Sequence, residues 1–295
     1  MNSPYTLNRG PNTGEEQRLD IQHYNMWMPV AKHLLPPHIF GHLMELDHPP
    51  AIADLATGTG IWLRDLATKL PSNARLDGYD YDTSKFAQAS QLPDNVQLFP
   101  GDVLKPFHEQ LRAQYDVVHV RMLVLGLKAD QWAEAAGNIK TLLRPGGWLV
   151  WEDFGHPGIT CVPVTKEFAL WSNAEVQYAR SVGRDIIAPT RLLSQIQESG
   201  YVDCHENIYH SFGLPENLRK TAGQLFMAGA RQILKGTLDK IESTVINSHV
   251  EVDALIDKVI SDIETDRCVV GFYIHVITGQ TETKDMGRTE VHLEQ

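Results

Sequence analysis

Residues 51–70, AIADLATGTGIWLRDLATKL, decide the fold of this chain. The run begins with a short apolar segment, as in a buried parallel strand, and from Ile61 to Leu70 apolar residues recur at helical spacing. The turn between them consists of small residues, and Gly58 and Gly60 lack a Cβ, so the backbone there can approach a ligand closely. The free N–H groups at the start of the helix point toward the same place. The stretch therefore predicts a strand, a loop and a helix around a nucleotide-like ligand, with a purely structural turn as the alternative.

Composition places the chain among ordinary globular proteins. Its 295 residues are 42% hydrophobic and 21% charged, enough for one large domain or a domain with an insertion. The net charge of −11 argues against a nucleic-acid partner, because such binding relies on Lys and Arg that displace counterions from phosphates. The three cysteines lie far apart and no histidines have a metal-ligand spacing, so we expect neither a disulfide framework nor a bound metal.

Hydropathy gives an expectation for location. No stretch approaches the roughly 20 apolar residues that span a bilayer. Residues 1–22 are polar and lack the apolar core of a secretory signal. We therefore expect a cytoplasmic protein with no membrane partner, while the sequence carries no signal for the oligomeric state.

A second short strand, within RLDGYDYDTSKF at 75–86, is predicted to end at Asp80. Asp80 lies 80 − 60 = 20 residues beyond Gly60, and in doubly wound nucleotide folds an acid at about this distance accepts hydrogen bonds from ribose hydroxyls. Asp82 is the alternative, but with the two hydroxyl residues that follow it has the pattern of a helix cap. A solvated carboxylate with no ligand is the remaining possibility.

A central strand is predicted from YDVVHVRMLVLGL at 115–127, an almost continuous apolar run. His119 and Arg121 interrupt the run, and the period of two places both on one side of the strand. A charged Arg121 at the carboxyl end of a buried strand needs an anionic partner. A ligand carboxylate or a protein acid would both serve.

The segment DLATGTG resembles motif I of the class I methyltransferases that use S-adenosylmethionine, usually written acidic-x-Gly-x-Gly-x-Gly. Asp54 is the acid, and Ala56 replaces the first glycine, which narrows the φ/ψ range at that position. A second match is RPGG at 144–147, before the predicted fifth strand, WLVWEDF. The pairs RL at 18–19 and QH at 22–23, with YDVVHVR, look like the methyltransferases of fungal secondary metabolism.

The resemblance implies an α/β fold, a doubly wound seven-stranded sheet in the order 3-2-1-4-5-7-6. Strand 7 would be antiparallel and helices would cover both faces. Two late stretches have the composition of the last strands, YVDCHENIYHSF at 201–212 and CVVGFYIHVITG at 268–279.

The same resemblance implies three parts. Residues 1–48 would form an N-terminal arm and helical lid, and 281–295 a polar tail. Residues 49–280 would form the methyltransferase domain, with substrate-side helical insertions after strand 5 at about 160–190 and 215–265.

S-adenosylmethionine is the implied cofactor. In the family pattern, Asp102 would accept from the adenine amino group and the N–H of Val103 would face the adenine edge, while Tyr5, Gln22 and His23 would fold over the cofactor. The implied cofactor site contains Tyr5, Gln22, Asp54, Ala56, Thr57, Gly58, Gly60, Asp80, Tyr81, Asp102, Val103 and Arg121.

The implied activity is O-, N- or S-methylation of a small-molecule acceptor from secondary metabolism. RML at 121–123 stands where nucleic-acid and protein-amide methyltransferases often carry Asn/Asp-Pro-Pro-Tyr, which argues against those substrates. A general base is needed only for an un-ionised hydroxyl acceptor. The candidates are Glu152, Asp153 and His156 at the end of the fifth strand, with His23 from the lid. A regulatory or non-methylating protein that binds S-adenosylmethionine is the alternative, and a nicotinamide oxidoreductase is disfavoured by the missing third glycine.

Overall fold

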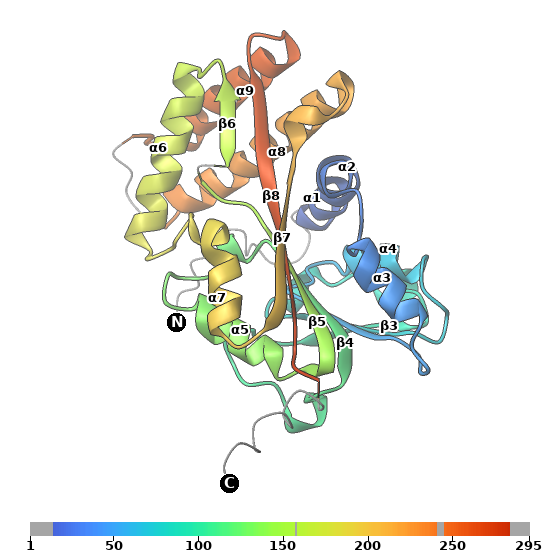
Figure 1. The fold of residues 1–295 in the computed structure, drawn as a ribbon. Coiled ribbons are helices and arrows are strands. Elements are labelled where there is room, and N and C mark those ends of the chain that lie inside the picture. Colours follow the sequence, from blue (N-terminus) through green and yellow to red (C-terminus); the bar gives the residue numbers. More distant parts are fainter. Residues whose placement is uncertain (1–13, 157, 241–244, 284–295) are drawn as a thin grey trace.

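A single twisted sheet forms the centre of the computed structural model, which describes residues 14–156, 158–240 and 245–283 (Figure 1). Its strands run in the order β3-β2-β1-β4-β5-β8, and β6 and β7 both pair with β8. The first five strands are parallel, whereas β8 is antiparallel to β5, β6 and β7. The strands are β1 Ala51–Leu55, β2 Arg75–Asp80, β3 Val96–Pro100, β4 Tyr115–Arg121, β5 Leu143–Asp153, β6 Ile159–Val162, β7 Val202–His210 and β8 Val269–Gln280.

The predicted strand order is confirmed, because β7 and β8 occupy the places of the sixth and seventh strands. The short strand β6 is an addition that the sequence did not predict. It pairs with the outer half of β8, where Cys161 lies opposite Val270. Only four residues long, β6 has too short a pattern to be distinguished from a loop.

Helices cover both faces of the sheet. The α-helices of the described residues are α1 Glu15–Gln22, α2 Met28–Ala31, α3 Pro37–Met44, α4 Ile61–Ala67, α5 Trp132–Lys140, α6 Lys166–Ser181, α7 Leu192–Glu198, α8 Glu216–Leu238 and α9 His249–Glu264. The short turns are η1 His23–Trp27, η2 Thr83–Lys85, η3 Ala89–Gln91, η4 Glu109–Leu111, η5 Leu123–Leu125, η6 Ala188–Arg191 and η7 Ser211–Gly213.

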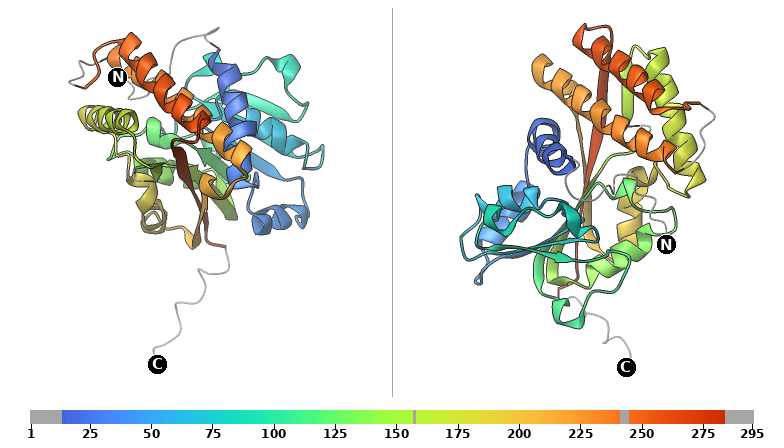
Figure 2. Two further views of the ribbon diagram at one scale, coloured as in Figure 1. Left: turned by 90° about the horizontal axis from the view of Figure 1, so that it is seen from above. Right: turned by 180° about the vertical axis from the view of Figure 1, so that it is seen from behind.

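Alternate residues of the central strands supply two hydrophobic cores. Val117 packs in the core beneath α3 and α4, while its neighbour Val118 packs in the core beneath α5 and α7. The almost continuous apolar run of β4 is therefore explained by burial on both faces. The first core continues into α8 and α9, which pack side by side beyond the sheet (Figure 2).

Helices α6, α8 and α9 gather around the outer half of β8, whereas α7 lies beside α5 (Figure 1). Helix α6 lies within the predicted insertion at 160–190, and α8 and α9 lie within 215–265. The division of the chain at 48 and 280 stays a prediction.

The N-terminal segment is one continuous helical run from α1 to α2, interrupted by a π-helical turn at His23–Trp27. The wider turn places His23, Met26 and Trp27 on the buried side, each 1% exposed. Trp27 packs near Phe154 at a ring distance of 6.0 Å. The second half of the predicted lid is therefore part of the core.

Candidate functional site

A cavity of about 810 Å³ lies at the carboxyl ends of β1, β2 and β4, beneath the N-terminal helical run. This volume is in the range of small-molecule sites. One side is formed by the glycine loop and the ends of the neighbouring strands, with the lining residues Ala56, Thr57, Gly58, Thr59, Asp80, Tyr81, Asp102, Val103 and Arg121. The opposite side is largely apolar, with the lining residues Phe154, His156, Ile159, Trp171, Glu175, Ile186, Leu225, Phe226, Ala230 and Ile233.

The structure brings most of the predicted site residues to this cavity. Gln22 and His23 line it from the N-terminal run, and His156 lines it from the loop after β5. Asp54, Gly60 and Glu152 lie outside the lining. Tyr5 falls outside the described residues.

Asp80 ends β2 and holds the glycine loop. Its Oδ2 accepts the backbone N–H of Gly58 at 2.8 Å, and its Oδ1 accepts the N–H of Asp82 at 2.9 Å. The side chain is buried, and burial raises the pKa of Asp80 while the two N–H groups oppose that shift. A carboxylate can accept about four hydrogen bonds, and these two are the ones that the described residues donate to Asp80. Asp82 instead caps η2 by accepting the N–H of Ser84, as the sequence predicts.

The glycine loop contains three residues with left-handed backbone before the helix begins: Ala56, Gly58 and Gly60. Gly58 has φ +59°, where a Cβ would lie 3.4 Å from Leu19 of α1. Ala56 has φ +57°, a conformation that costs a non-glycine residue roughly 1–2 kcal/mol. The sequence indicates that alanine has a narrower φ/ψ range than glycine at this position. In the structure Ala56 adopts the left-handed conformation, so its backbone is strained beside the cavity.

A buried chain of polar groups supports the loop from below, formed by Thr57, Asp54, His119, Glu152 and Trp27. The Thr57 hydroxyl donates to Asp54 Oδ2 at 2.6 Å, and Asp54 Oδ1 pairs with His119 Nδ1 at 2.7 Å. His119 Nε2 lies 3.9 Å from Glu152 Oε2, which accepts the indole N–H of Trp27. This chain connects the cofactor-side loop to the N-terminal helices.

His119 is fully buried and stacks on Trp62 at a ring distance of 3.8 Å. Burial lowers the pKa of His119, but the hydrogen bond and charge of Asp54 and the contact with Glu152 outweigh burial and raise it. The imidazole thus lies between the carboxyl groups of Asp54 and Glu152. Asp54 and Glu152 are both engaged in this chain, which explains why neither lines the cavity.

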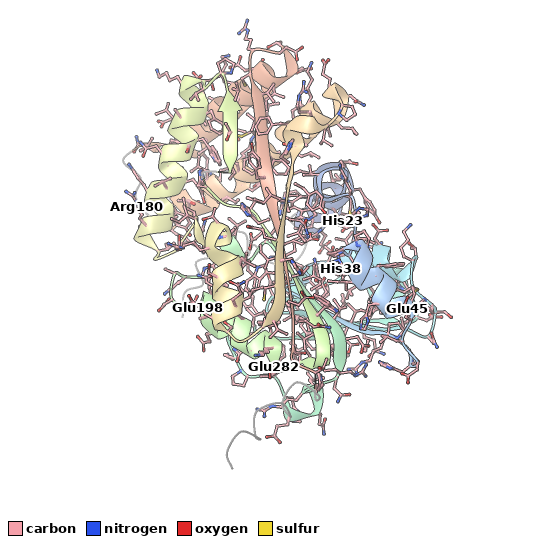
Figure 3. All side chains as sticks on the ribbon, viewed as in Figure 1. His23, His38, Glu45, Arg180, Glu198 and Glu282 are labelled. Atoms are coloured by element: carbon pink, nitrogen blue, oxygen red, sulfur yellow. The ribbon has the colours of Figure 1, made fainter. Side chains whose placement is uncertain are left out.

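Arg121 faces His23 at the end of β4. Its Nη1 lies 3.1 Å from His23 Nδ1, and its guanidinium lies over the ring of Trp27 at 5.3 Å. His23 Nε2 pairs with Asp65 at 3.1 Å. Burial and then the charge of Arg121 lower the pKa of His23 to about 4. His23 is therefore neutral, with Nδ1 accepting from Arg121 and both ring nitrogens engaged. Figure 3 shows His23 on the N-terminal run, on the opposite side of the view from Arg180 and Glu198.

His156 has a different environment. No described residue bonds its buried Nε2, and the ring lies 5.8 Å from that of Trp171. Burial lowers the pKa of His156 below its ordinary value of 6.5. Asp153 lies outside the lining and accepts the N–H groups of Val124 and Phe154. Of the base candidates, His156 alone combines a place in the lining with ring nitrogens that no described protein group occupies.

Sequence reasoning missed several lining residues, among them Leu19, Trp27, Glu175 and Phe226. Trp171 and Glu175 lie four residues apart on α6, so both face the cavity from one side of that helix. The spacing of four residues could have predicted that the two side chains lie on one face of a helix. Only the packing of α6 shows that this face contacts the cavity.

Comparison with known proteins shows likeness to methyltransferases. A family model described as a methyltransferase domain matches residues 52–147. The N-methyltransferase tcpN of Claviceps purpurea is 27% identical over 196 residues, covering 66% of this chain and 68% of that protein. The methyltransferase grgD of a Penicillium species is 33% identical over 150 residues, covering 48% of this chain and 50% of that protein. The family model and these relatives support a class I S-adenosylmethionine-dependent methyltransferase.

Among solved structures, phosphoethanolamine N-methyltransferase 2 of Haemonchus contortus, bound to phosphomonomethylethanolamine and S-adenosylhomocysteine, superposes with a TM-score of 0.54. At 13% identity, with 94% of this chain and 60% of that chain covered, this likeness shows the fold alone. Proteins named as secondary metabolism regulators also match, such as laeA of Fusarium oxysporum f. sp. lycopersici at 22% identity over 175 residues.

S-adenosylmethionine is the cofactor of the chain, and the cavity fits it. The described residues donate two hydrogen bonds to Asp80, and the backbone of Gly58 leaves open the space that a side chain would occupy. The ribose contact of Asp80 stays a prediction. Asp102 lines the same side, although its Oδ1 already accepts the N–H of Leu104 at 3.0 Å. Across the described ranges, no group of three His, Cys, Asp or Glu residues could hold a metal ion. No helix in those ranges is both long and apolar enough to cross a membrane.

Replacing Asp80 tests the proposed cofactor contact. Asp80→Ala removes charge-assisted hydrogen bonds worth roughly 1.5–3 kcal/mol, so the Kd for S-adenosylhomocysteine should rise about ten- to a hundredfold. Calorimetric titration measures this change. Asp82→Ala is the matched control and should have a small effect, because that carboxylate caps η2. A severe effect at Asp82 with a silent Asp80 would contradict the assignment.

Proposed function

We propose that this chain methylates a small, largely apolar acceptor molecule at O, N or S. One observation carries the proposal: a single cavity joins the glycine loop to an apolar wall built by α6, α8 and the loop after β5. Such a cavity can hold a cofactor and an acceptor together. The net charge of −11 supports a small molecule over a nucleic acid as the acceptor.

S-adenosylmethionine, when bound, supplies a methyl group that its sulfonium already activates. The residues of the chain then align the acceptor and exclude water, which together account for much of the acceleration in such transfers. Trp27 and Leu19 close the cavity from the N-terminal run. Phe154, Trp171 and Phe226 form the apolar wall against which the acceptor would lie.

We propose His156 as the base for an acceptor hydroxyl. The neutral imidazole would take the proton, so kcat/KM should fall in acid as His156 becomes protonated. Since burial lowers the pKa of His156, that fall should begin below pH 6.5 and leave a plateau above it. In His156→Gln, kcat should fall about a hundredfold. The decrease of kcat/KM at acid pH should also disappear, because the group that becomes protonated is gone. An unchanged pH profile in the variant would exclude this role.

Transfer of label is the direct test of the proposed function. The protein is incubated with S-adenosylmethionine labelled in the methyl group and with an extract of its own cells. We expect label in an extractable small molecule, and its mass fragments identify the methylated atom. Binding of S-adenosylhomocysteine without any labelled product would instead favour the regulatory alternative, which the match to secondary metabolism regulators supports.

A further inference from the structure

The apolar wall of the cavity contains one carboxylate, Glu175 of α6. The other residues that the cavity takes from α6, α8 and the loop after β5 are uncharged at neutral pH. Glu175 is 6% exposed, so its charge is removed from bulk water. A buried carboxylate in an otherwise apolar wall costs stability unless it is paired.

Arg184 pairs with Glu175 and fixes its position. Arg184 Nη1 donates to Glu175 Oε1 at 2.8 Å. The backbone of Arg184 bridges to Lys128 in the loop after η5, and its guanidinium lies over the ring of Tyr178 at 5.0 Å. Burial raises the pKa of Glu175, and the charge and hydrogen bond of Arg184 oppose that shift. The orientation of the carboxylate is therefore determined by the protein.

The second oxygen of this carboxylate remains available. No described residue donates a hydrogen bond to Glu175 Oε2. This oxygen is also absent from the set of unbonded side-chain atoms that are fully buried, so part of its surface is accessible. Because Glu175 lines the cavity, this oxygen can accept a hydrogen bond there. Trp171, one helical turn earlier, presents its ring to the same space.

We propose that Glu175 is a specificity-determining residue that binds a neutral N–H or O–H donor of a ring-containing acceptor. The ion pair with Arg184 already balances the charge of Glu175, so a neutral donor suits Oε2 better than a second cation does. The apolar wall selects the rest of the molecule through aromatic contact and burial. The inference rests on the proposed function, because it concerns the acceptor side of the same cavity.

Three naphthalenes that carry different substituents at the same ring position test the proposal. Their binding is measured by calorimetry on the protein saturated with S-adenosylhomocysteine. The probes are 2-naphthylmethanol, which has a neutral donor, 2-methylnaphthalene, which has none, and 2-naphthoate, which is an anion. In the native chain the alcohol should bind about tenfold tighter than the methyl compound, and the anion should bind most weakly. In Glu175→Gln the preference for the alcohol should shrink at least threefold, while the anion should bind more tightly.

A purely structural role for Glu175 would shift all three affinities alike, and that result would overturn the proposal. Glu167→Gln, the same substitution on α6 at a residue outside the lining, should leave them unchanged. If Glu175→Gln fails to fold, the double variant Glu175→Met with Arg184→Met removes both charges and should abolish the preference for the alcohol. Transfer of label from methyl-labelled S-adenosylmethionine tests the proposed function separately, because that assay does not use the naphthalene probes. The two failures are therefore distinguishable.

Discussion

Gly58→Val should abolish measurable binding of S-adenosylhomocysteine, with at least a hundredfold rise in Kd. Gly58 has φ +59°, and a β-branched residue is strongly disfavoured in that left-handed conformation. Its Cβ would already lie 3.4 Å from Leu19, so the two γ-methyl groups would extend into the cavity or displace α1. Relaxing the loop would also break the hydrogen bond from Gly58 N–H to Asp80. Calorimetric titration measures the loss, and circular dichroism checks that the variant is folded.

Ala56→Gly is the matched control in the same loop. Ala56 has φ +57°, so glycine relieves local strain at the cost of a more flexible unfolded chain. We expect a melting temperature equal to or slightly above that of the native chain and cofactor affinity within about twofold. Equal loss of binding in both variants would mean that the loop is structural and the ligand lies elsewhere.

The sequence predicted the cofactor side of this site better than the acceptor side. The strand, loop and helix at 51–70 and the strand end at Asp80 follow from local patterns, namely apolar runs, small residues and a fixed distance along the chain. The family resemblance predicted the strand order, which is confirmed. The acceptor wall could not be predicted in this way, because Trp171 and Glu175 reach it only through the packing of α6.

Register explains what local patterns could not show about Glu152. It was predicted as a base candidate because it lies at the end of the fifth strand. In the sheet register, Asp54 of β1 lies opposite His119 of β4, and Arg121 of β4 lies opposite Glu152 of β5. The four side chains therefore lie on one face of the sheet, where Glu152 contacts Trp27. This arrangement depends on the register of three strands, which local patterns do not show. The π-helical turn that brings Trp27 into contact with Glu152 has no signal in the sequence either.

The buried chain through His119 leads to the largest expected loss of stability. His119→Leu keeps much of the side-chain volume but leaves Asp54 and Glu152 facing each other without the imidazole between them, whose pKa is raised in the folded chain. Breaking a buried ion pair by removing one partner costs about 3–5 kcal/mol, so the melting temperature should fall by roughly 5–15 °C. Cofactor affinity should fall too, because Asp54 also accepts the hydroxyl of Thr57 in the glycine loop.

The pH dependence of stability separates this charge effect from lost packing. The pKa of His119 is raised in the folded chain, so its contribution is fully present below the unfolded value near 6.5 and is lost as pH rises through the folded value. The gap in unfolding free energy between the native chain and His119→Leu should therefore narrow above pH 6.5. His33→Leu, at an exposed histidine, should change stability by less than about 0.5 kcal/mol at every pH. A gap between native chain and His119→Leu that stays constant with pH would show that His119 acts by stacking on Trp62 alone, with no net charge between the two carboxylates.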